Sequence, residues 1–413
     1  MISPMEIIPQ SIIGLALLFG TVSGSADASG STSVETATNR FGLDLFHQVR
    51  AQVSDEPNTI ISPLSAALAL DMVYLGAEGQ TKEAMNKTLH LPDVSRGELT
   101  DLLAGTMNKL DQSDSAIVFN LANSAWLNEV WEFNEEYLST VRSCLEAELS
   151  RVNYSDPSTK DRINNWVSEA TESKIDQIIE TVEPDMAMIL INALYFKADW
   201  EKQFKESNTQ IKPFTLVDGS TIDHHLMSLT ERLRYAETPE MEIVELAYKG
   251  QQQSMFILLP SDSLTVDDLL DRMTYEWWKE NSERLEYKRG RLELPRFELT
   301  SDYMLNNALK DLGMGVAFSP DESDLSSMLV GNELPAGERL YISEVRQKTF
   351  IEVMETGTEA AAATSVGIRV TAAMGDTEPV TFEMKVDRPF VFVLADDATG
   401  IMLFVGKVAD PRQ

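Results

Sequence analysis

The first half of the chain carries apolar residues at helical spacing, a pattern that predicts a run of amphipathic helices. Ser62 and Pro63 open one of them as a serine N-cap followed by proline in the first turn, and Gly76 ends it. Another predicted helix, over 163–179, would turn Trp166, Val167, Ile175 and Ile178 inward. Helices are predicted at 41–53, 62–75, 82–89, 98–110 and 163–179.

The second half of the chain has short runs rich in β-branched and aromatic residues, a composition that predicts strands. Helical spacing returns only at 265–273 and 301–312. Because helices come first and strands later, the sequence predicts an α+β domain and not a regular alternation of strands and helices. Strands are predicted at 188–195, 242–246, 254–259, 292–294, 350–353, 380–386, 390–394 and 401–405.

The N-terminal segment has the pattern of a signal peptide. The apolar run over 12–22 is too short to span a bilayer comfortably, and Ala26-Asp27-Ala28 offers a small-residue cleavage site. The run lacks a positive leader, since the first Lys or Arg is Arg40, so a retained anchor and a misplaced start codon remain alternatives. We expect a signal peptide over 1–28, a Ser/Thr/Gly-rich linker over 29–38, one domain over 39–413, and secretion.

Composition and charge narrow the classes of partner. The 413 residues include 43% hydrophobic residues, enough for a packed core. A formal net charge of −32 would repel nucleic acid and anionic membrane surfaces, so neither is expected as a partner. Cys144 is the only cysteine, which excludes an intrachain disulfide, and we expect a buried structural thiol there.

No constellation of residues in the sequence indicates an enzyme. Zinc-binding His-Glu-x-x-His, the Gly-x-Ser-x-Gly elbow and the phosphate-binding glycine loop do not occur in it. His224 and His225 are adjacent, so on a strand they would point to opposite faces and could not hold one metal ion together. We therefore expect no catalytic residues, no metal and no cofactor.

Several segments together resemble the serpin family of serine protease inhibitors, from about Phe41 to Pro411. The resemblance implies a serpin fold, in which helices pack around three β-sheets and a reactive-centre loop, about 355–381, is exposed near the C-terminus. It also implies that 294–297 forms a strand of the main sheet. The segments are Asn58-Thr-Ile-Ile-Ser-Pro-Leu-Ser65, Leu75-Gly-Ala-Glu-Gly-Gln-Thr81, Ile163-Asn-Asn-Trp-Val167, Asn192-Ala-Leu-Tyr-Phe-Lys-Ala-Asp-Trp200, Leu294-Pro-Arg-Phe297, Asp387-Arg-Pro-Phe390 and Leu403-Phe-Val-Gly-Lys-Val408.

The resemblance implies a single-use mechanism. A serine protease attacks one bond of the loop and forms its acyl-enzyme, and the cut loop then inserts into the main sheet as an extra strand, which distorts and traps the protease. The protein would then be a monomeric inhibitor and not an enzyme. A non-inhibitory serpin, acting as a chaperone or binding protein, is the alternative.

The hinge of the loop has the side chains that insertion needs. A strand alternates faces with a period of two, and a slip of one residue would bury Glu359 and Arg369. Gly357 would supply a flexible pivot after Glu355. One face is small or apolar throughout and comprises Thr358, Ala360, Ala362, Thr364, Val366, Ile368 and Val370; the other comprises Glu359, Ala361, Ala363, Ser365, Gly367, Arg369 and Thr371.

The position of the attacked bond is less sharply defined by the sequence. The family's usual spacing from Glu355 places it at Thr371–Ala372, with Arg369 and Met374 as alternatives. Small residues at this bond fit an elastase-like or subtilisin-like protease, whereas Arg369 would fit a trypsin-like one.

Two further groups of residues are expected to control when the sheet opens. By resemblance, Ser62, Ser65, Asn192 and Gln347 form a polar shutter under the sheet centre, where the family commonly has histidine in place of Gln347. Glutamine keeps the hydrogen-bonding capacity but loses the pH sensitivity. Trp200, Arg296 and Glu355 align with the breach at the top of the sheet, where we predict a Glu355–Arg296 ion pair.

Overall fold

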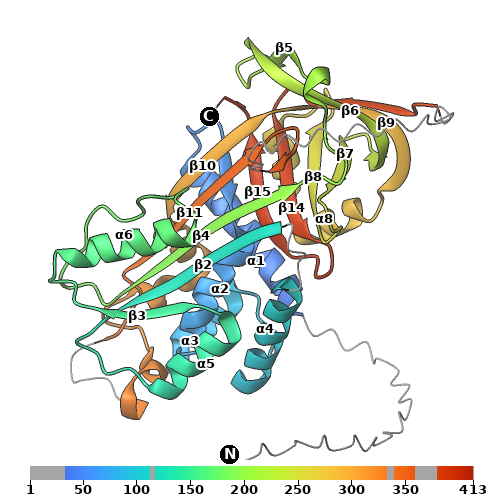
Figure 1. Ribbon diagram of the computed structural model, residues 1–413. Coiled ribbons are helices and arrows are strands. Elements are labelled where there is room, and N and C mark those ends of the chain that lie inside the picture. The colour runs from blue at the N-terminus through green and yellow to red at the C-terminus, as the bar shows by residue number, and fades with distance from the viewer. Residues whose placement is uncertain (1–32, 112–116, 333–338, 359–378, 413) are drawn as a thin grey trace, which may run out of the picture. The chain divides into compact units, whose positions relative to one another are not determined.

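Figure 1 shows the computed structural model, which describes residues 33–111, 117–332, 339–358 and 379–412. Helices dominate the first part of the chain and strands the second, so the predicted α+β organisation is confirmed. The helices are α1 Val34–Gln52, α2 Pro63–Tyr74, α3 Gly79–Thr88, α4 Arg96–Asp111, α5 Glu135–Leu145, α6 Ser158–Ala170, α7 Val266–Leu270, α8 Tyr275–Ser282 and α9 Asn306–Leu309.

A six-stranded sheet forms one half of the β structure, with the order β10-β11-β12-β4-β2-β3. Along 344–350, β11 pairs directly and in parallel with 189–195 of β4. Nearer its end, β11 is separated from β4 by the two residues of β12. The strands are β2 Ile117–Asn128, β3 Glu148–Val152, β4 Met188–Asp199, β10 Phe297–Met304, β11 Glu344–Val353 and β12 Gly357–Thr358.

The other strands form one continuous nine-stranded sheet, with the order β1-β15-β14-β8-β7-β6-β9-β13 and β5 paired to β6. The resemblance implied three β-sheets in all, whereas the described strands form two, because the 17-residue β6 pairs with β5, β9 and β7 in turn and joins them. The strands are β1 Thr59–Ile61, β5 Gln210–Thr215, β6 Thr221–Glu237, β7 Met241–Ala247, β8 Gln253–Pro260, β9 Glu286–Pro295, β13 Phe382–Lys385, β14 Phe390–Asp396 and β15 Met402–Val408.

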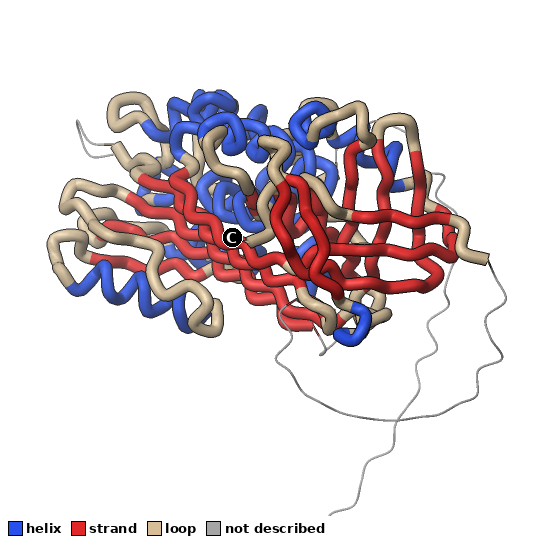
Figure 2. The backbone as a smooth tube through the Cα atoms, turned by 90° about the horizontal axis from the view of Figure 1, so that it is seen from above, coloured by secondary structure: helices blue, strands red, loops and turns tan. Residues whose placement is uncertain are grey.

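Helices cover both faces of the six-stranded sheet. Figure 2 shows most helices on one side of the strands, and on that side α2 is buried along its whole length between the sheet and β15. On the opposite face α6 packs Ile163 and Val167 on a separate cluster that includes Ile189 and Ile191 of β4. Strand β4 is therefore buried on both faces along 188–196, whereas alternate residues of β11 are half-buried.

Two predicted boundaries near the helices are wrong. The linker was expected to reach residue 38, but α1 already begins at Val34, capped by Ser33, whose hydroxyl accepts from the Thr36 amide at 3.2 Å. The helix expected over 163–179 ends at Ala170, and Ile175 and Ile178 are buried in an irregular segment instead. The Asn164 side chain accepts from the amides of Ile178 and Ile179 at 3.0 Å and fixes that segment without a helix.

Two predictions around β10 also fail. The helix expected over 301–312 starts as strand, because Ser301–Met304 continue the pairing of β10 with β11. The segment 294–297 is not one strand of the main sheet: Leu294 and Pro295 end β9 in the nine-stranded sheet, and Phe297 begins β10. Arg296 therefore lies at the crossing between the two sheets.

Candidate functional site

The start of the loop is already part of the six-stranded sheet. After β11 the chain turns at 354–357, where Met354 and Gly357 exchange backbone hydrogen bonds of 2.9 and 3.2 Å. Thr358 then pairs with Val353 on one side and with Ala198 of β4 on the other. The expectation of an exposed hinge is wrong for Glu355, Gly357 and Thr358, which are all buried.

The inward direction predicted for Thr358 is confirmed. Its hydroxyl lies 2.6 Å from the hydroxyl of Tyr248, whose ring stacks on Trp200 at a centroid distance of 4.4 Å. Phe196 contacts the same ring edge-on. The hinge residues Glu359, Ala360, Ala361, Ala362, Ala363 and Thr364 lie outside the described residues, as do the reactive-bond candidates Arg369, Thr371, Ala372 and Met374.

The predicted ion pair between Glu355 and Arg296 is confirmed. Arg296 donates from Nε and a terminal nitrogen to Glu355 Oε1 at 2.9 and 2.6 Å, and the Thr209 hydroxyl donates to the same oxygen at 2.5 Å. Burial disfavours the ionised carboxylate, but the hydrogen bonds from Arg296 and Thr209 outweigh it and hold the pKa of Glu355 below its usual value. Glu355 is therefore charged at neutral pH.

The segment after β4 holds the backbone of the same turn. Trp200 donates from its indole to Met354 O and from its amide to Thr356 O, each at 2.9 Å. The Gln203 side chain donates to Thr356 O at 3.1 Å. Together with Arg296 these groups bring the predicted breach residues into one cluster. Thr209 and Gln203 were not predicted, because polar residues in a loop carry no periodic signal.

Gly357 is required by a close approach between two backbones. A Cβ on this residue would lie 2.0 Å from Ala198 O and 2.6 Å from Asp199 Cα. Such distances are far shorter than van der Waals contact, and the neighbouring atoms belong to the backbone of β4. The flexible pivot predicted from the sequence remains a prediction, but the packing alone explains the glycine.

Replacing Gly357 with alanine is expected to expel β12 from the sheet and to break the Thr358–Tyr248 contact. Overpacking of this kind costs about 1–3 kcal/mol. Hydrogen–deuterium exchange over 354–358 should become faster. Gly97→Ala is the matched control, since nothing lies within 4 Å of its added methyl group. Unchanged exchange over 354–358 in Gly357→Ala would contradict the close approach.

The predicted shutter residues lie together beneath the sheet. Gln347 Nε2 donates to Ser62 O at 2.9 Å and to Asn192 Oδ1 at 2.7 Å, while the Ser62 amide donates to Gln347 Oε1 at 3.0 Å. Ser65 donates from its hydroxyl to Asn123 Oδ1 at 2.9 Å. Asn123 was not predicted, because the same strand also carries Asn120, Ser124 and Asn128, and nothing in the sequence distinguishes Asn123 from them.

A buried carboxyl on α2 was also not predicted. Asp71 is 2% exposed, and its Oδ1 has no hydrogen-bond partner among the described residues. Burial raises the pKa of Asp71 to about 7. Cys144 on α5 is buried, which confirms the predicted buried thiol. Burial is the main cause that raises the pKa of Cys144 to about 11, and the nearby Asp71 carboxyl adds to it.

The described residues show no group of His, Cys, Asp and Glu arranged to hold a metal ion. His224 does not chelate with His225, and its Nε2 instead lies 2.7 Å from Arg296 O, beside the breach. Across the described ranges, no helix combines the length and the hydrophobicity that a bilayer crossing requires.

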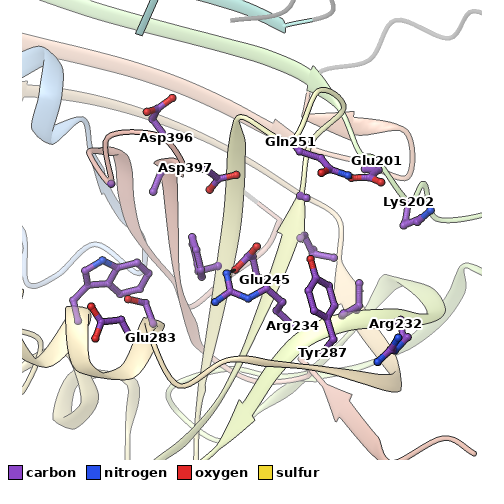
Figure 3. Close-up of a pocket in the computed structure, with 18 residues that line it drawn as sticks. Glu201, Lys202, Arg232, Arg234, Glu245, Gln251, Glu283, Tyr287, Asp396 and Asp397 are labelled. Atoms are coloured by element: carbon purple, nitrogen blue, oxygen red, sulfur yellow. Dashed lines mark hydrogen bonds and ion pairs between the residues drawn. The ribbon is translucent and has the colours of Figure 1, made fainter. Parts of the chain in front are cut away.

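A cleft of about 480 Å³ is lined by residues of β6, β7, β8, β9, β14 and α8, and Figure 3 shows its side chains. Several polar and charged side chains that line the cleft are hydrogen-bonded to one another. Arg234 donates to Glu245 at 2.5 Å, and Gln251 donates to Glu201 at 2.7 Å. The cleft thus has mixed charges that are largely satisfied within the protein.

The fold and the hinge define a class of protein in which the first residues of the reactive-centre loop pair with strands of the main sheet. Here these residues form β12, between β11 and β4. The serpin (serine protease inhibitor) family model matches residues 36–411. The chain therefore belongs to the serpin family.

Relatives and solved structures agree with this assignment. An uncharacterized serpin-like protein of Thermococcus kodakarensis is 33% identical over 92% of this chain and 86% of its own length. The leukocyte elastase inhibitor of Xenopus laevis is 34% identical over 92% of this chain and 100% of its own length. The native state of the thermophilic serpin tengpin is 32% identical with a TM-score of 0.81, covering 94% of this chain and 95% of that one.

Proposed function

We propose that this protein is an inhibitory serpin that traps a serine protease covalently and irreversibly. One observation carries the proposal: β12 lies between the ends of β11 and β4, in the place where an inserting loop would start. A cut after this point would free the following residues to extend β12 along the rest of the β11–β4 pair.

The chemistry of the loop supports insertion. In a strand that continued from Thr358, alternation would place only small or apolar side chains of 360–370 on the face that Thr358 turns inward, with no charge among them. A charged residue on that face would have to be buried without a partner, at a cost of several kcal/mol. A non-inhibitory serpin, acting as a chaperone or binding protein, is the second candidate, and this face argues against it.

The protease would attack Thr371–Ala372, with bonds at Arg369 and Met374 as the alternatives. We infer an elastase-like or subtilisin-like target from the small side chains, and a trypsin-like one if Arg369 is used. The relative named leukocyte elastase inhibitor fits the first choice. We also propose a signal peptide over 1–28, secretion, and action as a monomer.

Incubation with subtilisin-, elastase- and trypsin-like serine proteases tests the proposal. We expect one of them to form a complex that survives SDS electrophoresis, while the mass of the released C-terminal peptide identifies the bond. Replacing the residue on the N-terminal side of the identified bond with proline should abolish both the SDS-stable complex and the released C-terminal peptide. If every protease either ignores the loop or cuts it and leaves fully active, the protein is not an inhibitor.

A further inference from the structure

An acceptor sequence for N-linked glycosylation lies in the turn between β3 and α6. Asn-x-Ser/Thr is the triplet at which an asparagine amide nitrogen is joined to an oligosaccharide in secreted proteins. The chain contains two such triplets, Asn-Tyr-Ser at 153–155 and Asn-Lys-Thr at 86–88. Because so short a triplet also occurs by chance, the surroundings of each asparagine decide whether a glycan fits there.

The triplet at 153–155 presents its acceptor groups to solvent. Tyr154 is 2% exposed, and its hydroxyl donates to Trp126 O at 2.7 Å, which anchors the middle of the triplet. Asn153 and Ser155 on either side of it are exposed. Neither Asn153 Nδ2 nor the Ser155 hydroxyl makes a hydrogen bond with the residues that the structure describes. Both groups that N-glycosylation requires are therefore accessible in the folded protein.

Asn153 shapes the turn through its oxygens alone. Its Oδ1 accepts from the Ser155 amide at 2.9 Å, which forms an Asx turn. Its backbone oxygen accepts from the Asp156 amide at 3.0 Å and from the Thr159 hydroxyl at 2.6 Å. A glycan attached to Nδ2 would leave each of these hydrogen bonds in place. The turn can therefore carry the modification without a change in its own structure.

The triplet at 86–88 is used by the fold instead. Asn86 lies within α3, and its Nδ2 donates to the Tyr74 hydroxyl at 3.2 Å. Thr88 is 6% exposed and donates from its hydroxyl to Leu312 O at 3.0 Å. A sugar on Asn86 Nδ2 would crowd the Tyr74 contact, and the threonine hydroxyl is already buried and bonded. This triplet is the internal comparison for the one at 153–155.

The triplet at 153–155 lies apart from the place where the loop would insert. It directly follows β3, which is the edge strand of the six-stranded sheet. In the order of the described strands, β4 and β2 stand between β12 and β3. Covering a sheet edge also hinders its pairing with another chain. A glycan beside β3 is thus compatible with insertion and would shield this edge of the sheet.

We propose that Asn153 is an N-glycosylation site. In this reaction Asn153 Nδ2 forms a bond to the anomeric carbon of an oligosaccharide linked to a lipid phosphate. The bond between that carbon and the phosphate oxygen breaks, the lipid phosphate leaves, and one amide proton is lost to water. The proposal rests on the proposed secretion, since N-linked glycans are added to chains that leave the cytoplasm.

Peptide mass spectrometry of the protein purified from its own cells and their medium tests the site. Trypsin cuts after Lys and Arg, so it releases the two triplets on separate peptides, 152–160 and 83–87. We expect the first peptide to carry the mass of one oligosaccharide and the second to be unmodified. Ser155→Ala should lose the added mass although Asn153 is intact, Ser155→Thr should keep it, and Asn86→Gln should leave it unchanged.

The opposite results are equally specific. An unmodified 152–160 peptide in protein recovered from the medium overturns the assignment of Asn153, while secretion stands. The same unmodified peptide in protein that is found only inside the cells overturns both the assignment and the proposed secretion. Added mass that persists in Ser155→Ala places the modification on another residue and also overturns the proposal. Failure to trap a protease would change none of these masses, so it is distinguished from failure of this site.

Discussion

Asp71→Asn is expected to raise the unfolding free energy of the intact protein at pH 8 by up to about 4 kcal/mol. The carboxyl titrates near 7 in the folded state against a usual value of 3.8, and one pKa unit corresponds to about 1.4 kcal/mol. The unfolded chain releases this proton at lower pH than the folded one, so the wild type loses stability as pH rises from about 4 to 7. Above pH 7 the loss is complete.

Denaturant unfolding at pH 4, 6 and 8 measures this effect as the difference between wild type and variant, which cancels other titrating groups. The difference should be small at pH 4 and largest at pH 8. Asp161→Asn on the exposed face of α6 is the matched control and should follow the wild type at each pH. A constant difference across the series would show that Asp71 does not titrate in this range.

Glu355→Lys is expected to lower the unfolding free energy by about 1–3 kcal/mol, the cost of removing a charged hydrogen-bond partner from a pair in which Glu355 is buried but Arg296 is 36% exposed. The new ammonium would face Arg296 in a position where the native side chain is only 5% exposed. Opening of the sheet at this point should also speed polymerisation on warming, which size-exclusion chromatography measures. Thr356→Lys places the same charge on the adjacent, half-buried residue and should change both quantities far less.

The pH dependence of this pair has the opposite sign to that of Asp71. The pKa of Glu355 is lowered in the folded state. The stabilisation by its carboxylate is therefore fully present above the usual pKa of 4.5 and is lost as pH falls through the folded-state pKa. Glu355→Gln should therefore approach wild-type stability in acid. Equal stability of wild type and Glu355→Lys at neutral pH would contradict a structural role for the pair.

The sequence predicted those parts of the site that depend on local pattern. Ser62 caps α2 as expected. The Glu355–Arg296 ion pair could be predicted because the family resemblance aligned both residues with the breach. The burial of Gly357 and Thr358 was missed, since the pairing of two residues with distant strands has no local signature. The burial of Asp71 was missed because a polar residue in a helical pattern is typical of the exposed face of an amphipathic helix. In the structure every residue of α2 is buried.

The fold predictions failed where tertiary contacts override periodicity. Ser301–Met304 have helical spacing with the residues that follow, yet hydrogen bonding to β11 extends β10 through them. Ile175 and Ile178 match the spacing of α6 but are held by Asn164 after the helix has ended. In both places a contact with a residue distant in the sequence determines the structure, and a local sequence pattern does not contain that information.

The two residues of β12 have a kinetic consequence. Starting a new strand between two others is the slow, entropically costly step, whereas adding residues to an existing strand is a zipper-like process. Because β12 is present before any cut, this nucleus is formed in advance, and only the separation of β11 from β4 along 344–350 still opposes insertion. Under the proposed mechanism, how readily that parallel pair opens would govern the race between trapping and release of the protease.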